Sequence, residues 1–311
     1  MIHITIGTSG HIDHGKSTII KVLTGIDPDR LDEEKKRGMT IDLGFAHLQM
    51  DSDYTVSFID VPGHEKFLKN MLAGITGINF VLFIIAANEG VMPQTIEHLQ
   101  ILKLLGIKKG AVILTKTDLV DEEFLELVTD DMKTFFRGSL LENAPVIKFS
   151  AITGEGKNDI LEILKQLKNE KSNSEISQLI LPIDRVFTKS GFGTIITGTL
   201  YSGTINEGET LILMPLNREI KVKQLQIHGN RVYKAKFGER VALAISNIEV
   251  KEINRGNVLI SPGSFRLTNT IDVKLKILNE LKKEVKNNDR IKFYHFSSEC
   301  IGRISFLEKN L

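Results

Sequence analysis

A loop near the N-terminus has the residue types and spacing of a phosphate-binding site. Residues 10–17 read Gly-His-Ile-Asp-His-Gly-Lys-Ser and match GxxxxGK[ST], between an apolar run and a helical one. Its glycines let backbone N–H groups and the helix N-terminus point at one anion. We expect Lys16 to neutralise phosphate charge and the Ser17 hydroxyl to ligate Mg2+. His11 and His14 have the chemistry of a metal pair, but inside this loop we interpret them as structural or backbone contacts. The predicted nucleotide contacts here are Gly10, Asp13, His14, Gly15, Lys16, Ser17 and Thr18.

A second motif supplies an acidic group for a cation. The run Asp60-Val-Pro-Gly63 follows an apolar strand, which places Asp60 near Mg2+ and lets the Gly63 N–H face a γ-phosphate. Thr40 lies in a charged stretch without apolar periodicity. Its hydroxyl suits a ligand that joins Mg2+ only when a γ-phosphate is present. The predicted metal ligands are Ser17, Thr40 and Asp60.

Two further motifs have the chemistry of a guanine reader. The run from Thr115 to Asp118, Thr-Lys-Thr-Asp, resembles the NKxD motif of GTPases. The Asp118 carboxylate can accept hydrogen bonds from the guanine N1–H and amino group, and the Lys116 stem can pack on the ring. Adenine lacks this pair of donors, so the expected ligands are GTP and GDP with Mg2+. The predicted base contacts are Thr115, Lys116, Asp118, Ser150, Ala151 and Ile152, the last three in a match to SAxTG.

The elements that must position these motifs alternate between short apolar runs and longer helical ones. From Met1 to about Lys171 there are five strand-then-helix units. This order predicts an α/β domain, a parallel-rich, doubly wound sheet with helices on both faces. In such a sheet ligands bind beyond the carboxyl ends of the strands, and each motif above follows a strand. The nucleotide-binding domain is therefore predicted at residues 1–174.

The rest of the chain changes to a period of two with frequent glycines. This pattern predicts a small antiparallel β-barrel at residues 175–264. Residues 265–311 contain three expected strands, in VKLKIL, RIKFYHF and IGRISFL. Three strands rarely form a stable domain. We therefore predict that this segment is the incomplete first part of a second β-barrel.

Composition excludes several classes of protein. The 311 residues are 41% hydrophobic and 25% charged, which excludes disordered and collagen-like chains. Cys300 is the only cysteine, which excludes a disulfide scaffold, and we interpret it as a small buried hydrophobe in an apolar strand. The longest apolar run, residues 80–87, is far shorter than the roughly 18 residues of a membrane helix. With no signal-peptide pattern at the N-terminus, these features predict a cytoplasmic protein.

Longer segments together resemble one protein family. The runs GHIDHGKST, RGMTID, DVPGHE and LPIDRVFTKSGFGTIITGTL are similar to those of translational GTPases of the elongation-factor-Tu superfamily. The stretch from Leu23 to Phe45, where factor Tu carries a longer insertion, most closely resembles selenocysteine-specific elongation factors, the SelB family. TKTD in place of NKxD and the run GERVALAISNIEVKEINRG point the same way. The resemblance is strong to about residue 263 and weak beyond it.

The resemblance implies a GTP hydrolase that delivers selenocysteinyl-tRNA to the ribosome. It assigns to His64 the positioning of the attacking water when the sarcin-ricin loop docks, which gives a timed hydrolysis. Thr115 stands where the superfamily has an asparagine that ties the base reader to the phosphate loop. We therefore expect a less rigid guanine site, compatible with weak GDP retention.

The resemblance also implies an aminoacyl pocket in the barrel, formed by Asp184, Arg185 and Arg240. A selenol ionises more readily than a thiol, so fixed arginine charge can accept the selenolate and reject neutral serine. Net charge is only +1, but the stretch from Arg218 to Arg240 has seven basic and two acidic residues, +5 in all. We expect this stretch to meet a tRNA acceptor stem.

The chain is shorter than the family implies. At 311 residues we expect a fragment without the C-terminal winged-helix part that binds the selenocysteine-insertion element of messenger RNA. Three alternatives stay open. Factor Tu or the gamma subunit of initiation factor two would share every GTPase residue. A factor-Tu-like subunit of ATP sulfurylase or a P-loop kinase would use adenine, against which Asp118 argues. An interaction module with a degenerate site is disfavoured by the intact motifs.

Overall fold

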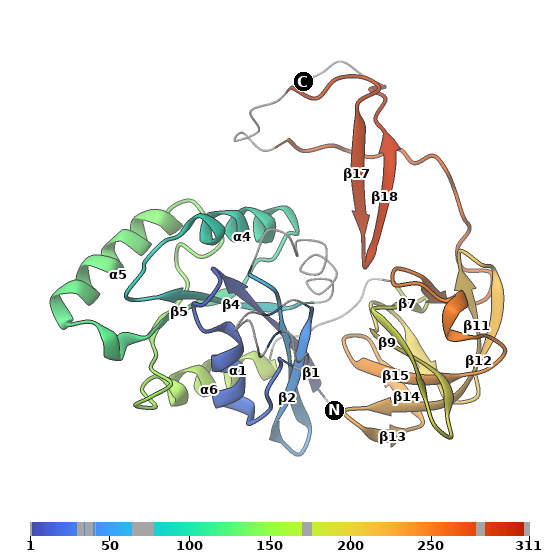
Figure 1. Cartoon of the computed structure of the whole chain (residues 1–311), viewed down its shortest axis with the longest axis horizontal. Helices are drawn as coiled ribbons and strands as arrows, with labels where there is room; N and C mark the ends of the chain where they lie inside the picture. The colour runs from blue at the N-terminus through green and yellow to red at the C-terminus, as the bar shows by residue number, and fades with distance from the viewer. Residues whose placement is uncertain are drawn as a thin grey trace.

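The first domain is built on one six-stranded sheet. The computed structural model describes residues 2–29, 34, 40, 42–63, 78–169, 176–277 and 284–307 (Figure 1). The sheet has the order β2-β3-β1-β4-β5-β6, and every pair except β2–β3 is parallel. The predicted parallel-rich sheet is thereby confirmed. Its strands are β1 (Ile2–Gly10), β2 (Gly44–Asp51), β3 (Tyr54–Asp60), β4 (Phe80–Ala86), β5 (Gly110–Thr115) and β6 (Val146–Lys148).

Helices cover both faces of this sheet, because successive strand residues point to opposite sides. Ile84 packs with residues of α1 and α6 in one apolar core, and its neighbour Ile85 packs with residues of α4 and α5 in another. The helix expected after β3 lies outside the described residues. The described helices of this domain are α1 (Lys16–Thr24), α4 (Pro93–Leu104), α5 (Glu122–Phe136) and α6 (Lys157–Gln166), with 3-10 turns η2 (Thr117–Leu119) and η3 (Leu167–Asn169).

The antiparallel edge strand β2 is absent from the predicted strand-then-helix units. It joins β3 through a tight turn and pairs with it from Gly44 opposite Asp60 to Asp51 opposite Tyr54. A Cβ at Gly44 would lie 2.7 Å from the Pro28 side chain, so this crossing requires glycine. The pairing brings the segment that follows Thr40 alongside the carboxyl end of β3. The two predicted metal-ligand segments therefore meet at one edge of the phosphate loop.

The second unit is an antiparallel sheet that wraps around its own apolar core, as predicted. Its strand order is β7-β16-β11-β12-β15-β9-β8, with β13 beside β12, and β10 pairs separately with β14. A Cβ at Gly198 in β9 would lie 2.1 Å from the Pro182 oxygen in β7, so this glycine lets the ends of the sheet approach. The elements are β7 (Ile180–Pro182), β8 (Arg185–Lys189), β9 (Gly193–Thr199), β10 (Thr204–Asn206), β11 (Thr210–Met214), β12 (Arg218–Ile227), β13 (Asn230–Val232), β14 (Lys234–Lys236), β15 (Arg240–Ile245), η4 (Val250–Glu252) and β16 (Val258–Ile260).

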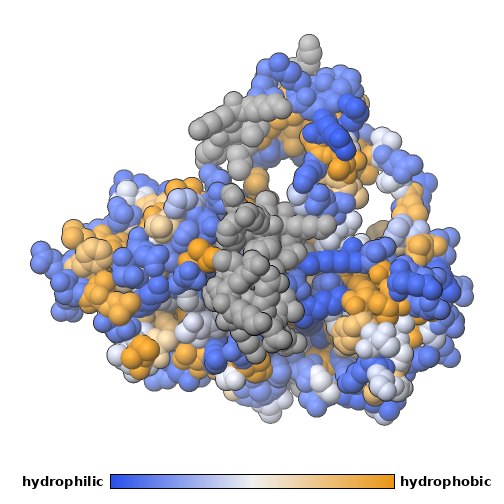
Figure 2. Space-filling model, in the orientation of Figure 1, coloured by the Kyte–Doolittle hydropathy of each residue, from blue (hydrophilic) through white to orange (hydrophobic). Residues whose placement is uncertain are grey.

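The third segment contains one described hairpin, β17 (Arg290–His295) with β18 (Ser298–Arg303). The strand expected in VKLKIL is wrong within its described part, because residues 273–277 have no regular structure. Cys300 is exposed, which corrects its interpretation as a buried hydrophobe. Its strand belongs to a sheet of two strands among the described residues, and such a ribbon buries little of either face. Figure 2 shows hydrophobic residues among the hydrophilic ones in this segment. Its exposed apolar residues include Phe265, Leu267, Ile271, Val273, Leu275 and Ile301.

The boundaries at residues 174 and 264 stay predictions. The expected linker falls largely on residues 170–175, which lie outside the described part of the chain. Among the residues that the structure describes, no helix is long and apolar enough to cross a membrane.

Candidate functional site

The phosphate loop joins β1 to α1 at the carboxyl end of the sheet. Gly10 has φ +136°, and a Cβ there would lie 2.1 Å from the Ile84 oxygen, so only glycine fits. Lys16 is buried, and its Nζ donates to the carbonyl oxygens of Gly10 at 3.0 Å and His11 at 2.6 Å. Burial lowers the pKa of Lys16 to about 8, although nearby carboxylates oppose this. The ammonium is therefore mostly charged at neutral pH and lies inside the loop.

The remaining loop residues lie as a phosphate cradle requires. Gly15 has φ +93° immediately before the first residue of α1, and Asp13 is also left-handed, at φ +60°. Asp13 and Thr18 are exposed, whereas His14 is fully buried. Burial lowers the pKa of His14 to about 4, although Glu89 opposes this, and its Nε2 lies 3.6 Å from the Glu89 carboxylate. Among the described residues there is no group of three His, Cys, Asp or Glu that could hold a metal. The structural interpretation of the two loop histidines stays a prediction.

The three predicted metal ligands converge beside the loop. The Ser17 hydroxyl donates to Asp60 Oδ2 at 2.6 Å and lies 2.9 Å from the Thr40 hydroxyl. Thr40 also donates to Asp29 Oδ1 at 2.9 Å. Burial raises the pKa of Asp60 to about 6, although hydrogen bonds from Ser17 and Thr8 oppose this. A buried carboxylate with two hydroxyls is a hard oxygen set that suits Mg2+, so these residues fit the predicted metal.

Gly63 brings the end of the DxxG motif against the phosphate loop. A Cβ at Gly63 would lie 2.6 Å from Lys16 Nζ and 2.9 Å from the backbone nitrogen of Ile12. This close approach requires glycine and leaves the Gly63 backbone beside the predicted γ-phosphate position. His64, the next residue, lies outside the described residues, so its role stays a prediction.

The guanine motifs follow β5 and β6 at the same edge of the sheet. The Thr115 hydroxyl donates to the His14 carbonyl oxygen at 2.7 Å, so threonine still ties the base reader to the phosphate loop. The structural reason for expecting a less rigid site is therefore wrong. Lys116 is left-handed, with φ +58°, and its Nζ pairs with Glu89 at 3.0 Å. Asp118 is exposed in η2, where its carboxylate can meet a base.

The last guanine motif is a tight turn organised by one buried side chain. The Ser150 hydroxyl is fully buried and accepts hydrogen bonds from the backbone nitrogens of Ile152 at 3.2 Å and Thr153 at 3.1 Å. This leaves Ala151 exposed and Ile152 84% exposed. The turn lies at the same edge as the Asp118 turn, because the backbone nitrogen of Thr117 donates to the Phe149 carbonyl oxygen at 3.5 Å. Its contact with the guanine oxygen stays a prediction.

The predicted aminoacyl pocket lies where the barrel meets the first domain. Both terminal nitrogens of Arg240 donate to the Asp184 carboxylate, one of them at 3.0 Å. Thr197 donates to the same carboxylate at 2.6 Å. Burial alone would raise the pKa of Asp184, but the Arg240 guanidinium and these hydrogen bonds hold it below its usual range. Asp184 therefore orients Arg240.

The first domain contributes directly to this pocket. The ring of Phe45, in β2, has its centroid 3.4 Å from the Arg240 guanidinium carbon and 5.3 Å from that of Arg185. The Arg185 guanidinium donates to the Asp42 carboxylate at 3.1 Å and to the Leu43 carbonyl at 2.5 Å. The Phe45 ring is thus within cation–π distance of both guanidiniums. One side chain of the first domain therefore contacts both arginines of the barrel.

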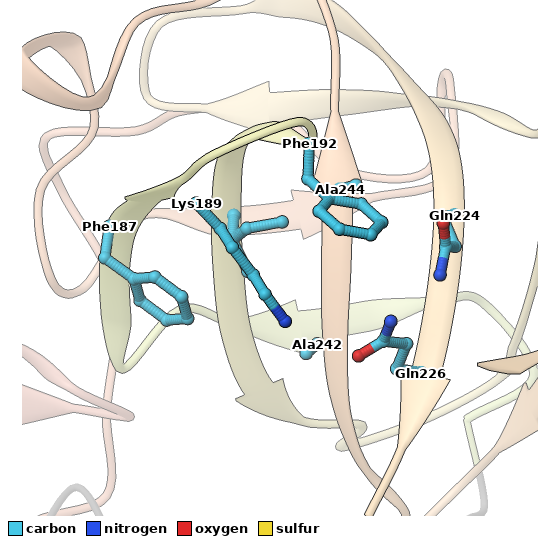
Figure 3. A pocket seen from close by; sticks show the side chains of 8 residues that line it. Phe187, Lys189, Phe192, Gln224, Gln226, Ala242 and Ala244 are labelled. Carbon is cyan, nitrogen blue, oxygen red and sulfur yellow. The ribbon is translucent and has the colours of Figure 1, made fainter. Parts of the chain in front are cut away.

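A hollow on the barrel is lined in part by residues of β8 and β15, the strands that carry the two arginines (Figure 3). Arg185 and Phe187 are two residues apart in β8, and Arg240 and Ala242 are two residues apart in β15. Because side chains two apart along a strand point to the same side, each pair shares a face of the sheet. Figure 3 shows two aromatic rings and the Lys189 stem facing two glutamine amides. The hollow is lined by Phe187, Lys189, Phe192, Ile195, Gln224, Gln226, Ala242 and Ala244. Aromatic faces with adjacent amides can stack on a base and bond its edge.

The basic stretch from 218 to 240 is less positive in the structure than along the chain. Arg218 pairs with Glu252, and Arg231 pairs with Glu207. Arg240 pairs with Asp184, as described above. Three of the seven positive charges therefore have acidic partners, and all three partners lie outside the stretch, whose own acidic residues are at 219 and 239. The lysines at 221, 223, 234 and 236 are exposed.

Comparison with known proteins decides the family. The profile of the elongation factor Tu GTP binding domain matches residues 1–170, more than half of the chain, and that of elongation factor Tu domain 2 matches residues 193–260. The chain belongs to the elongation factor Tu GTP-binding family. Within this family of GTPases, the resemblance to selenocysteine-specific factors is also confirmed.

The relatives include a selenocysteine-specific elongation factor of Desulfomicrobium baculatum, 45% identical over 99% of this chain and 49% of that protein. That of Escherichia coli is 40% identical over 98% of this chain and 49% of its own length. A crystal structure of a bacterial selenocysteine-specific factor has TM-score 0.89 and 37% identity, covering 99% of this chain and 52% of that one. Methanococcus maripaludis SelB with the GTP analogue GPPNHP has TM-score 0.82 and 31% identity, covering 96% and 64%. The chain thus spans about half the length of the first two relatives.

Several residues at the site were not predicted. From α4, His98 Nδ1 accepts from the Gly10 backbone nitrogen at 3.0 Å, and Gln94 Oε1 accepts from that of Ile12 at 3.1 Å. Burial lowers the pKa of His98 to about 3, so the ring is neutral and can accept. Pro93 could have indicated where this helix begins, because proline is common at the first position of a helix. A helix that begins after β4 starts beside the loop after β1, since both follow the carboxyl ends of neighbouring parallel strands. No local signal marked Asp42 or Phe45 as pocket residues, because their partners come from the barrel.

Proposed function

We propose that this chain is a GTP-dependent carrier of selenocysteinyl-tRNA, which it delivers to the ribosome, where GTP is hydrolysed. Its relatives are selenocysteine-specific elongation factors, which supports the cargo, and its family is defined by a GTP-binding domain, which supports the nucleotide. The proposal assigns the nucleotide to the loops after β1, β3, β5 and β6. It assigns the aminoacyl end of the tRNA to the barrel face that meets β2.

The observation that carries this function is the continuity of the arginine pair with the hollow. Residues two apart along a strand lie about 7 Å apart on one face. Arg185 and Phe187 have this spacing in β8, and Arg240 and Ala242 have it in β15. An aminoacyl group at the arginines would therefore leave the terminal base of the same tRNA within reach of the aromatic hollow. The arginine pair thus suits the aminoacyl group, and the aromatic hollow suits the terminal base of the same tRNA.

The nucleotide site accounts for the coupling to GTP. Ser17, Thr40 and Asp60 would hold Mg2+, which neutralises charge on the β- and γ-phosphates. Lys16 holds a buried positive charge at the loop, and the Gly63 backbone lies beside it. Thr40 reaches this site from the segment that leads into β2, so contacts with the γ-phosphate can alter the segment that supplies Asp42 and Phe45. We assign to His64 the positioning of the attacking water on the ribosome.

The test compares selenocysteinyl-tRNA with seryl-tRNA on the same tRNA body. Binding to the chain is measured with a non-hydrolysable GTP analogue and with GDP, and GTP-versus-ATP competition is measured in parallel. We expect preference for the selenocysteinyl form, stronger with the GTP analogue, and exclusion of ATP. Equal affinity for the two tRNAs would indicate another tRNA-carrying factor of the factor Tu or initiation-factor type. Effective competition by ATP would indicate an adenine-using enzyme.

A further inference from the structure

A carboxylate of the first domain occupies the arginine pocket. Asp42 accepts hydrogen bonds from Arg185 at 3.1 Å and from Arg255 at 3.2 Å, through its two different oxygens. The side chains of Asp42, Arg185 and Arg255 are 28%, 30% and 27% exposed, so water screens these pairs only in part. Asp42 is thus an internal anion in the place where an external one is expected.

The two pocket arginines are neutralised in different ways. Arg240 is held by Asp184, a carboxylate of the barrel itself, in a bidentate pair supported by Thr197. Arg185 has its carboxylate partner, Asp42, on a different domain. Three guanidiniums and two carboxylates give this cluster a net charge of +1. Replacement of the carboxylate by an external anion therefore requires less rearrangement of the barrel at Arg185 than at Arg240.

We propose that Asp42 is a specificity-determining residue, an internal anion that holds Arg185 until an anionic aminoacyl group replaces it. This inference rests on the proposed function and names the means of selection. A selenolate that displaces Asp42 leaves Arg185 paired. A neutral serine side chain that displaces Asp42 leaves a partly buried guanidinium without its hydrogen-bonded carboxylate, which is unfavourable. Competition with a built-in anion thus selects against neutral groups as well as for charged ones.

The position of Asp42 in the chain links this exchange to the nucleotide site. Asp42 lies two residues after Thr40, whose hydroxyl lies 2.9 Å from that of Ser17. Two residues after Asp42, Gly44 pairs with Asp60 at the start of β2. Asp42 therefore lies between two residues that contact predicted magnesium ligands, Thr40 beside Ser17 and Gly44 opposite Asp60. Its release from Arg185 would occur between these two contacts. The proposed exchange belongs to the segment that the γ-phosphate is expected to order.

The deciding variant is Asp42→Asn, which retains the side-chain shape and removes the charge. Binding of selenocysteinyl-tRNA and seryl-tRNA to the full 311-residue chain is measured with the GTP analogue. We expect the variant to bind seryl-tRNA more tightly, so that the ratio of the two affinities falls by about tenfold or more. The matched control is Glu252→Gln, which removes a carboxylate paired with Arg218 elsewhere on the barrel. It should leave the ratio unchanged even if both tRNAs bind more tightly.

Further variants separate charge from folding. Asp42→Glu keeps the charge and should keep the ratio, whereas Asp42→Ser should lower it as Asn does. Guanine-nucleotide affinity and the thermal midpoint show that each variant is folded. A wild-type ratio in a folded neutral variant overturns the inference while the proposed function stands. An equal loss in the Glu variant also overturns it, because charge would not be the cause. Absence of any preference in the wild-type chain instead refutes the proposed function.

Discussion

The buried carboxylate of Asp60 offers a direct test of the predicted magnesium site. Its side chain is inaccessible to solvent and accepts hydrogen bonds from Thr8 and Ser17, each at 2.6 Å. Burial raises its pKa from 3.8 to about 6, against the effect of these hydrogen bonds and of Lys16. An ionised group in this position is stabilised by a bound cation and destabilises the domain without one. The substitution Asp60→Asn removes the charge and keeps the size.

The expected magnitude follows from the pKa. A rise from 3.8 to about 6 makes ionisation of Asp60 cost about 3 kcal/mol in the folded state. Poorer hydrogen bonding by the amide offsets about 1 kcal/mol of this. We therefore expect Asn to stabilise the metal-free protein at pH 7.5 by about 2 kcal/mol, which raises the midpoint of a domain of this size by roughly 5 °C.

The difference in stability between the wild type and Asp60→Asn should depend on pH. Because the folded pKa of Asp60 is raised, its contribution to stability is fully present below about pH 4 and is lost as pH rises through about 6. The variant lacks this loss but keeps the poorer hydrogen bonds, so it should be about 1 kcal/mol less stable than the wild type near pH 4 and about 2 kcal/mol more stable at pH 7.5. Comparing the two proteins at each pH cancels the other titrating groups.

The assay is thermal unfolding across this pH range without Mg2+ or nucleotide, repeated with Mg2+ and GTP. Added Mg2+ and GTP should stabilise the wild type far more than the variant. Asp53→Asn, a substitution at an exposed carboxylate paired with Lys168, is the control and should shift little at any pH. A variant that is less stable than wild type at pH 7.5, or an advantage independent of pH, would refute the reasoning.

Three further substitutions test the site. Changing Asp118 to Asn should shift preference toward xanthosine nucleotides in competition binding, and unchanged guanine selectivity would mean that the base is read elsewhere. Changing Thr115 to Val removes its hydrogen bond to His14, worth about 1 kcal/mol, so fluorescent GDP should dissociate several-fold faster in stopped flow; an unchanged rate would contradict the tie. Changing His64 to Ala should abolish ribosome-stimulated turnover with GTP affinity nearly intact, and a large loss of binding would contradict its role.

The nucleotide site could be predicted because its signals are local. Lys16, Asp60 and Asp118 each follow an apolar run that ends in a motif, and parallel strands bring their carboxyl ends to one edge. The sequence therefore indicates both the residues and their common place. Thr115 shows the limit of motif reasoning. Replacement of asparagine by threonine predicted the loss of the link to the phosphate loop, but the Thr115 hydroxyl donates to the His14 carbonyl oxygen.

The contacts between the domains could not be predicted in the same way. Asp42 and Arg255 are 213 residues apart and meet only because β2 is an antiparallel edge strand that faces the barrel. Their types alone are typical of charged surface residues. Phe45 likewise alternates in β2 as an ordinary core residue would, yet its ring contacts two guanidiniums. Domain packing, rather than local pattern, determines these partners.

Further described contacts between the two domains are made by uncharged groups. His228 stacks on His47 with ring centroids 4.0 Å apart and on His3 at 5.8 Å, and Thr5 donates to the Gly238 carbonyl at 3.1 Å. Burial, together with neighbouring histidines, lowers the pKa of His3 to about 4 and that of His228 to about 3, so both are neutral at physiological pH. None of these contacts involves Asp42 or Arg185. An anion can therefore replace Asp42 at Arg185 while the two domains stay in contact, which is the condition that selection by exchange requires.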